Sequence, residues 1–303
     1  RQPMDPVLGD LLHLLKLERI ETNIFRGESR DIGGAQVFGG QVLGQALSAA
    51  QHTVQDRRAH SLHAYFLRRG DMNAPIIYDV DRSRDGGSFS VRRVVAIQHG
   101  RPIFNFAASF QVPEVGLEHQ AEMPAVEGPD GLPDLTEMAP QILKKIPEKM
   151  HRFITAKRAF EFRPLAPMDF ISPEPRPPVK YVWIKAVDAL PDDQALHQNL
   201  LAYVSDYELL GTATLPHGLP FGQGRVLMAS LDHAMWFHRD VKIDDWLLYA
   251  MDSPNASGAR GFARGQVFSK DGALVASTTQ EGLVRVLSEA GAAKRRSDPR
   301  KQK

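Results

Sequence analysis

The feature that most constrains the fold is a pattern that occurs twice along the chain. In each half, a run of small and apolar residues without charge, typical of a buried helix, precedes four runs that partly alternate between apolar and polar residues, typical of strands. In the first half the helix is expected from Gly40 onward, with strands at 61–68, 75–82, 88–98 and 102–112. In the second half the helix is expected at 195–210, with strands at 225–231, 246–251, 259–269 and 273–286.

The two sets of elements match in order and in spacing, as a tandem duplication would produce. The stretch Ser61-Leu62-His63 matches Ser230-Leu231-Asp232, and Arg92 matches Arg264, each about 170 residues further along. Short links that contain glycine, such as His99-Gly100-Arg101, favour antiparallel hairpins. A buried helix followed by an antiparallel meander, and then repeated, predicts an α+β fold of two similar units.

The chain is accordingly divided into an N-terminal domain (10–113), a linker with a helix (114–157), a C-terminal domain (158–288) and a basic tail (289–303) that is expected to be disordered. The linker begins with residues rich in Pro, Gly and Glu. A short helix is expected at 5–17, an edge strand at 18–25, and an interrupted helix at 135–153. Six prolines between Pro164 and Pro178 favour extended backbone there.

Composition excludes several classes of function. A net charge of +1 gives no reason to expect a nucleic-acid partner, and no apolar run approaches the length of a membrane span. The absence of cysteine excludes disulfides, thiolate metal sites and a cysteine nucleophile. Asp232, His233 and His238 are spaced along a strand and turn, unlike two metal-binding histidines on one helix face, so no metal is expected. These features favour a cytoplasmic location.

The most informative polar residue is Asp206, on the second apolar helix, where no Lys or Arg lies three or four positions away. Its carboxylate must be hydrogen-bonded or have a raised pKa, unless it is a partly exposed cap. Gln280 lies on the last long strand, which is more polar than its counterpart at 106–111. The glycines that begin the first apolar helix expose backbone N–H groups that could hold an oxyanion, or they only permit a tight turn.

Six motifs in sequence order resemble those of the type II acyl-CoA thioesterases. They are Phe38-Gly39-Gly40-Gln41, His60-Ser61-Leu62-His63, Gly86-Gly87-Ser88-Phe89-Ser90-Val91-Arg92, Asp206-Tyr207, Leu231-Asp232-His233 with Met235-Trp236-Phe237-His238, and Gln280-Glu281-Gly282. The resemblance implies an α+β double hot-dog fold, in which each half is an antiparallel sheet around a central helix. It also implies hydrolysis of fatty acyl-CoA by water activated by Asp206, Ser230 and Gln280, without a cofactor. The bacterial enzyme of this family has Thr where this chain has Ser230, and the resemblance places this chain among the bacterial members.

Two other functions stay open at this point: an acyl-CoA binding or sensing module without turnover, and a hot-dog enoyl-CoA hydratase. A hydratase needs an Asp/His acid–base pair, and no histidine is adjacent to Asp206 in the sequence. His63, Arg260 and Arg264 are the candidates for contacts with the substrate, the two arginines because they pair with phosphates. A homo-oligomer is expected, because hot-dog sheets commonly associate.

Overall fold

The computed structural model describes residues 2–31, 37–137, 139–146, 148, 151–166, 173–220 and 224–298. The first half contains α1 (Pro6–Leu15), β1 (Glu18–Glu21), β2 (Ile24–Gly27), α2 (Gly39–Gln51), β3 (Arg58–Phe66), β4 (Ile76–Asp85), β5 (Phe89–Gln98) and β6 (Arg101–Gln111). A linking region contains the 3-10 helix η1 (Pro129–Gly131) and the short helices α3 (Ala139–Leu143) and α4 (His151–Thr155). The second half contains β7 (Phe160–Pro164), β8 (Val179–Ala186), α5 (Gln194–Ser205), η3 (Leu210–His217), β9 (Val226–Ser230), β10 (Asp232–Phe237), β11 (Leu247–Ser257), β12 (Arg260–Ser269), β13 (Leu274–Val286) and α6 (Glu289–Ser297).

One antiparallel sheet of 13 strands runs through both halves of the described chain, in the order β1-β2-β4-β5-β6-β3-β10-β13-β12-β11-β8-β7, with β9 paired to β13. β3 and β10 pair at its centre, where His63 lies opposite Ala234. Outward from this pair, β6-β5-β4-β2 on one side corresponds to β13-β12-β11-β8 on the other. The order is therefore the same in both directions, which confirms the predicted α+β double hot-dog fold. Association with a second copy stays a prediction.

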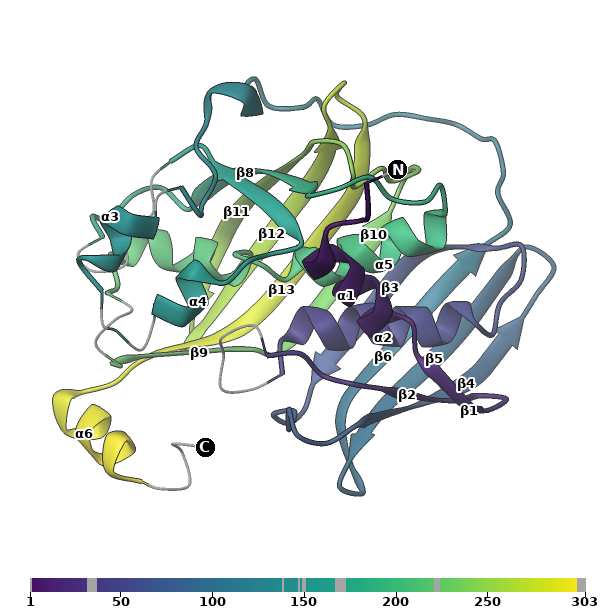
Figure 1. Cartoon of the computed structure of the whole chain (residues 1–303), viewed down its shortest axis with the longest axis horizontal. Coiled ribbons are helices and arrows are strands. Elements are labelled where there is room, and N and C mark those ends of the chain that lie inside the picture. The colour runs from purple at the N-terminus through teal and green to yellow at the C-terminus, as the bar shows by residue number, and fades with distance from the viewer. Residues whose placement is uncertain are drawn as a thin grey trace.

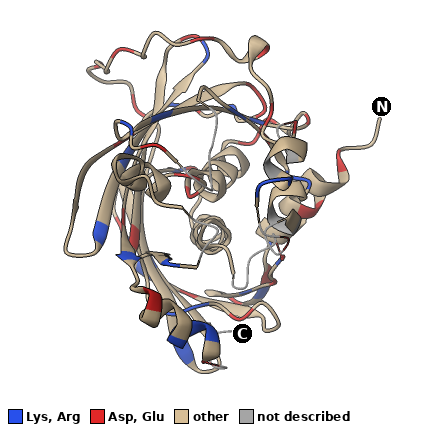
Figure 2. Ribbon diagram, turned by 90° about the vertical axis from the view of Figure 1, so that its left-hand side faces the viewer, with Lys and Arg blue, Asp and Glu red and all other residues tan. Residues whose placement is uncertain are grey.

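The two central helices, α2 and α5, lie side by side inside the curve of the sheet (Figures 1 and 2). Neither helix carries an acidic residue, Lys or Arg, and both are almost entirely buried. A Cβ on Gly40 would lie 2.1 Å from the Tyr203 carbonyl oxygen, and one on Gly44 would lie 3.3 Å from that of Asn199. Gly44 follows Gly40 along α2, whereas its partner Asn199 precedes Tyr203 along α5. The two helices are therefore antiparallel. Glycine is needed because a side chain would separate them.

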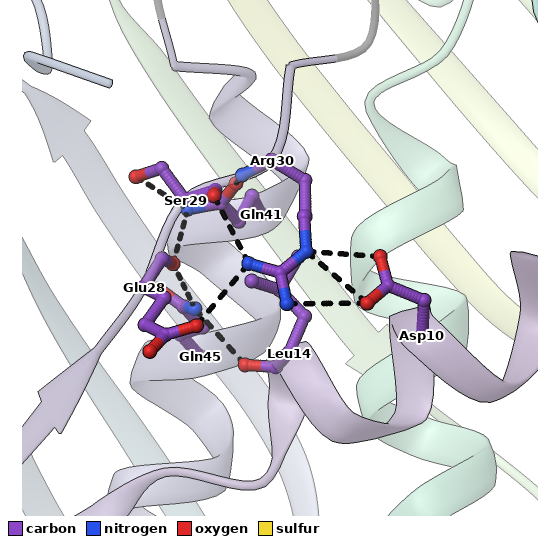
Figure 3. A network of polar contacts seen from close by, with 7 residues as sticks. All are labelled: Asp10, Leu14, Glu28, Ser29, Arg30, Gln41 and Gln45. Carbon is purple, nitrogen blue, oxygen red and sulfur yellow. Dashed lines mark hydrogen bonds and ion pairs between the residues drawn. The ribbon is translucent and has the colours of Figure 1, made fainter. Parts of the chain in front are cut away.

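Two buried glutamines on α2 connect this helix to the outer elements of the first half (Figure 3). The Gln41 amide nitrogen donates to the Glu28 carbonyl at 3.1 Å, and its oxygen accepts from the Arg30 backbone N–H. The Gln45 amide nitrogen donates to the carbonyls of Leu14 and Glu28. These contacts satisfy polar groups that would otherwise be costly to bury, and they fix α2 against α1 and the end of β2.

The C-terminal tail is a correction to the sequence analysis. Residues 289–297, expected to be disordered, form α6, which lies at the periphery of the molecule (Figure 1). Ser288 caps this helix by accepting from the Gly291 N–H, and Glu289 in the first turn and three basic residues in the last turn favour its dipole. The remaining tail residues, 299–303, lie outside the described residues. None of the described helices is both long and apolar enough to cross a membrane.

The match between Arg92 and Arg264 is wrong by one residue. Arg92 is 1% exposed, and its guanidinium donates to Thr53 and Asp85 inside the first half. Arg264 is exposed and pairs with Asp252. Because successive strand residues face opposite sides of a sheet, a shift of one residue exchanges the buried and exposed faces. Arg93, which is exposed, is the residue on the same face as Arg264.

Candidate active site

Asp206, Ser230 and Gln280 come together although they lie on three different elements. Asp206 is the C-cap of α5, Ser230 ends β9, and Gln280 lies on β13. The Gln280 amide nitrogen donates to Asp206 Oδ1 at 2.7 Å and to Ser230 Oγ at 3.2 Å. Pairing of β9 with β13, which sets Ser230 opposite Gly282, brings the hydroxyl to the amide. One side-chain amide therefore holds both a carboxylate and a hydroxyl.

The Asp206 side chain is only 7% exposed, and α5 ends just before it. The sequence pattern predicted a helix that continues to residue 210. In the structure, Glu208 has φ of 65°, which no α-helix tolerates, and the chain continues as η3 from Leu210. Asp206 therefore lies at the end of the helix, and the residues after it follow a different path. Its carboxylate is hydrogen-bonded, as one of the sequence-based alternatives required.

His233 is the neighbour that the sequence analysis missed. It is completely buried, and its Nδ1 lies 3.9 Å from Asp206 Oδ1. Ser205 Oγ donates to the Ala202 carbonyl, so it accepts from His233 Nε2–H at 2.9 Å. His233 Nδ1 is then left without a proton and lies 3.2 Å from the Gln280 amide nitrogen, whose two hydrogens are shared among Asp206 Oδ1, Ser230 Oγ and His233 Nδ1. The His233 ring thus connects Ser205, at the end of α5, to Gln280 through hydrogen bonds, and it orients the Gln280 amide.

The expected absence of a histidine near Asp206, used against the hydratase, is therefore wrong. His233 lies on β10, 28 positions after its partner Ser205, so spacing within one helix could not reveal it. Burial lowers the pKa of His233, while the charge of Asp206 acts in the opposite direction. With both ring nitrogens bonded and no exposed surface, His233 is a structural partner of Gln280 rather than a group that meets solvent.

A test of this burial is the dependence of stability on pH. The unfolded chain has a histidine pKa of about 6.5, and the folded value is lower for His233. Below the unfolded pKa the unfolded state binds more protons, so the free energy of unfolding decreases as the pH falls from the unfolded toward the folded pKa. In His233→Asn, which keeps an acceptor for Gln280, we expect a smaller decrease between about pH 7.5 and pH 5.5, by at most about 1.4 kcal/mol per pH unit.

Urea unfolding at both pH values measures this difference. His60→Asn serves as the comparison, because burial also lowers the pKa of His60, which is only partly buried. A smaller change is expected for it than for His233→Asn. An identical pH dependence of wild type and His233→Asn would contradict a neutral, buried His233.

Asp206 and Ser230 face a cavity of about 490 Å³. Its wall is mostly apolar and comes from both halves of the molecule: Val37, Phe38, Gly39, Val42, Phe66, Leu67, Arg68, Arg69, Gly70, Ile103, Phe104, Asp206, Met228, Ala229, Ser230 and Leu231. Gly39 begins α2, and a Cβ there would lie 2.8 Å from Asp206 Oδ2. The start of α2 is therefore in direct contact with the carboxylate, and its glycine makes this approach possible.

The other candidate residues lie elsewhere. His63 is exposed on β3 and packs edge-on against Trp236, with ring centroids 5.3 Å apart. Arg260 pairs with Glu281 and Arg264 pairs with Asp252, both at exposed positions, and none of the three residues lines the cavity of Asp206.

Asp232 on β10 and His238 just after this strand lie near His233 in the sequence but have separate hydrogen-bond partners. Asp232 accepts from the Glu281 backbone N–H, and His238 contacts Ser277. Each of these side chains therefore has a hydrogen-bond partner other than His233.

Comparison with known proteins identifies the family. Residues 27–111 match the model of the acyl-CoA thioesterase N-terminal domain, and residues 175–283 match that of acyl-CoA thioesterase. Acyl-CoA thioesterase 2 of Haemophilus influenzae is 47% identical over 93% of this chain and 99% of its own length. Human acyl-coenzyme A thioesterase 8 is 39% identical over 93% of this chain and 90% of its own.

Solved structures show the same architecture. An acyl-CoA thioesterase II from Mycobacterium marinum is 41% identical and superposes with a TM-score of 0.74 over 92% of this chain and 99% of its own. A protein with a hot dog fold from Alicyclobacillus acidocaldarius, only 19% identical, gives a TM-score of 0.75 over 92% of this chain and 99% of its own. The first comparison supports fold and family, and the second supports the fold.

Two central helices enclosed by one antiparallel sheet define a double hot-dog protein, and a carboxylate and a hydroxyl held by one amide at a cavity wall are suited to the activation of water. The chain belongs to the acyl-CoA thioesterase family, a family of thioester hydrolases. The resemblance seen in the sequence motifs is thereby confirmed.

Proposed function

We propose that this protein hydrolyses fatty acyl-CoA to the free fatty acid and CoA, with Asp206, Ser230 and Gln280 as its catalytic residues. The observation that carries the proposal is the contact of the Gln280 amide with both Asp206 and Ser230, at 2.7 and 3.2 Å, beside an apolar cavity. The family supports the reaction class, and this geometry supports the assignment of the three residues.

The hydrogen bonds suggest a role for each group. Asp206 and Ser230 line the cavity, whereas Gln280 is fully buried behind them. Since Ser230 Oγ accepts from Gln280, its own hydrogen is available to a water molecule in the cavity. Such a water would accept from Ser230 and donate to Asp206. In this arrangement Gln280 fixes the two groups that contact the water.

The reaction then follows general base catalysis. The water oxygen forms a bond to the thioester carbonyl carbon while its proton passes to Asp206. The tetrahedral intermediate collapses with cleavage of the carbon–sulfur bond, and the proton moves from Asp206 to the sulfur of CoA. No covalent acyl-enzyme is needed, because a thioester is reactive enough for direct attack by positioned water.

The start of α2 is suited to stabilise the oxyanion of this intermediate. Phe38 precedes the helix without a side-chain cap, and the first N–H groups of a helix have no partner within it. The N–H groups of Gly39 and Gly40 therefore lie at the positive end of the helix dipole without a partner inside α2. The contact between Gly39 and Asp206 places this end of α2 at the same wall of the cavity.

Release of free thiol from acyl-CoA esters of increasing chain length tests the function. We expect turnover by the wild type, because the carboxylate, the hydroxyl and the apolar cavity are all present. Binding of acyl-CoA without release of thiol at any chain length would favour the sensing module. Hydration of enoyl-CoA, without thiol release, would instead show that the Asp206–His233 pair serves a hydratase.

Ser230 permits a test with two closely related variants. Ser230→Ala removes the hydroxyl that would hold the water, so kcat is expected to fall about 10- to 100-fold. This factor corresponds to the loss of one hydrogen bond to a group that becomes charged in the transition state. Ser230→Thr keeps the hydroxyl and adds a methyl that restricts its rotamer, so kcat should stay within a few-fold of wild type. Steady-state kinetics on one acyl-CoA measures both. Full activity of Ser230→Ala would remove Ser230 from the mechanism.

A further inference from the structure

The cavity of Asp206 and Ser230 has a closed, apolar part and an open, cationic part. Val42, Ile103 and Phe104 are buried at 5%, 5% and 1% exposure, whereas Leu67, Arg68 and Arg69 are exposed. The residues that follow β3 therefore lie on the open side, together with the exposed Ala229 of β9. Among the described residues that line the cavity, Arg68 and Arg69 are the only cations, and Asp206 is the only anion.

Neither arginine is neutralised by an acidic partner within the described part of the chain, and this distinguishes both from Arg260 and Arg264. Arg68 donates from Nη1 to the Pro102 carbonyl at 2.7 Å, which directs its guanidinium without consuming its charge. Arg260 and Arg264, by contrast, each face a carboxylate, on Glu281 and Asp252 respectively. An arginine already paired with a carboxylate has less to gain from a phosphate than one that has no such partner.

This arrangement fits an elongated ligand with an apolar end, a reactive centre and an anionic end. Acyl-CoA has that form: the acyl chain is apolar, the thioester lies in the middle, and the phosphates of CoA follow the pantetheine arm. With the thioester at Asp206 and Ser230 and the acyl chain among the apolar residues, the exposed part of the cavity at Arg68 and Arg69 is left for the CoA moiety. Guanidinium groups bind phosphate through paired N–H donors.

We propose that Arg68 and Arg69 form the binding site for the phosphate groups of CoA, in place of Arg260 and Arg264. The proposal rests on acyl-CoA being the substrate, as the proposed function states. It assigns the exposed residues after β3 to recognition of the CoA moiety, and it leaves the buried residues of the cavity to the acyl chain. The two arginines then affect substrate binding and leave the chemical step unchanged.

Kinetics with two thioesters of the same acyl chain test this assignment. One is the acyl-CoA, and the other is the acyl thioester of N-acetylcysteamine, which has no phosphate. For Arg68→Gln and Arg69→Gln, KM for acyl-CoA should rise about fivefold each, and about 20-fold or more in the double variant, with kcat within about twofold of wild type. KM for the phosphate-free thioester should not change. Arg69→Gln is the cleaner variant, because Arg68 also contacts the Pro102 carbonyl.

The matched control is the double variant Arg260→Gln/Arg264→Gln, which makes the same chemical change outside the cavity and should leave both KM values unchanged. The proposal is wrong if this control raises KM for acyl-CoA and the Arg68/Arg69 variants do not. The proposal is also wrong if the Arg68/Arg69 variants raise KM for both thioesters by the same factor, since that pattern indicates a structural role for the arginines.

Titration calorimetry with CoA itself separates this proposal from the proposed function. CoA should bind the Arg68→Gln/Arg69→Gln protein at least about tenfold more weakly than wild type, while pantetheine should bind both proteins equally. These ratios do not require turnover. If the protein hydrolysed no thioester but showed these affinity ratios, the result would contradict the proposed hydrolysis and support the phosphate site. Equal CoA binding by both proteins would overturn the site.

Discussion

Asp206→Asn is expected to lower kcat for acyl-CoA hydrolysis by a factor on the order of 10² to 10⁴, the usual contribution of a positioned general base. Asparagine has nearly the same shape as aspartate, and its oxygen can still accept from the Gln280 amide. It cannot take a proton from water at neutral pH. The fold should therefore survive, and KM should change little, so that the loss appears in kcat. Thiol release from one acyl-CoA, with wild type and variant side by side, measures it.

Asp232→Asn is the matched control. Asp232 is two residues after Ser230, and its carboxylate accepts from the Glu281 backbone N–H, a bond that asparagine can also make. Removal of this charge near the site should leave kcat within a few-fold of wild type. If both variants lost activity alike, the effect would be a general change in local charge. If Asp206→Asn stayed fully active while wild type hydrolysed acyl-CoA, the base would have to be another group.

Gly40→Ala is expected to destabilise the fold strongly. The added Cβ would lie 2.1 Å from the Tyr203 carbonyl oxygen and 2.4 Å from Phe38 Cε1. The carbonyl belongs to the last turn of α5, so relief requires the two central helices to move apart. Overpacking of this kind typically costs about 1–3 kcal/mol, and a clash with backbone belongs at or above the upper end. The gain in helix propensity, about 1 kcal/mol, offsets only part of it.

Gly9→Ala provides the control, because Gly9 lies in the interior of α1 and nothing is within 4 Å of the added Cβ. This variant should be unchanged or more stable by up to about 1 kcal/mol. Urea denaturation of the two variants and the wild type compares them directly. We also expect Gly40→Ala to lose hydrolytic activity, since separation of α2 from α5 moves Gly39 away from Asp206. Equal stability of the two variants would contradict the close packing of these helices.

The repeated pattern of helix and strands was sufficient to predict the architecture. Period-two alternation and glycine-containing links are local properties, and so is the absence of charge on α2 and α5. They predicted the meander β3 to β6 and, in the second half, β11 to β13, with errors of a few residues at the boundaries. The strand expected at 225–231 is β9, whereas β10, the counterpart of β3, is not among the expected strands. The same reasoning failed where a local signal was weak: β7 lies just before the proline-rich stretch, and α6 begins after a single capping serine in an otherwise polar tail.

Motif order alone indicated Asp206, Ser230 and Gln280 as candidates, but their contact depends on the tertiary structure. Gln280 is 74 positions from Asp206, and the two meet because α5 ends beside β13 within the same half of the sheet. His233 could not be recognised from spacing, since its partners Ser205 and Gln280 belong to other elements.

The choice among the arginines also depends on the folded chain. Arg68 and Arg69 are preferred to Arg260 and Arg264 because the first two line the cavity and the other two face carboxylates. All four arginines are exposed. Arg68 and Arg69 follow β3, and Arg260 and Arg264 lie on β12, so their local sequence does not distinguish them.

By itself, then, the sequence determined the duplicated α+β architecture, the two buried helices and the family, because periodicity and motif order are written along the chain. Only the tertiary structure decided which polar groups meet and which charges face the cavity. The physical reason is that such contacts depend on the pairing of distant strands and on which faces pack together, and a shift of one residue, as between Arg92 and Arg93, exchanges a buried side chain for an exposed one.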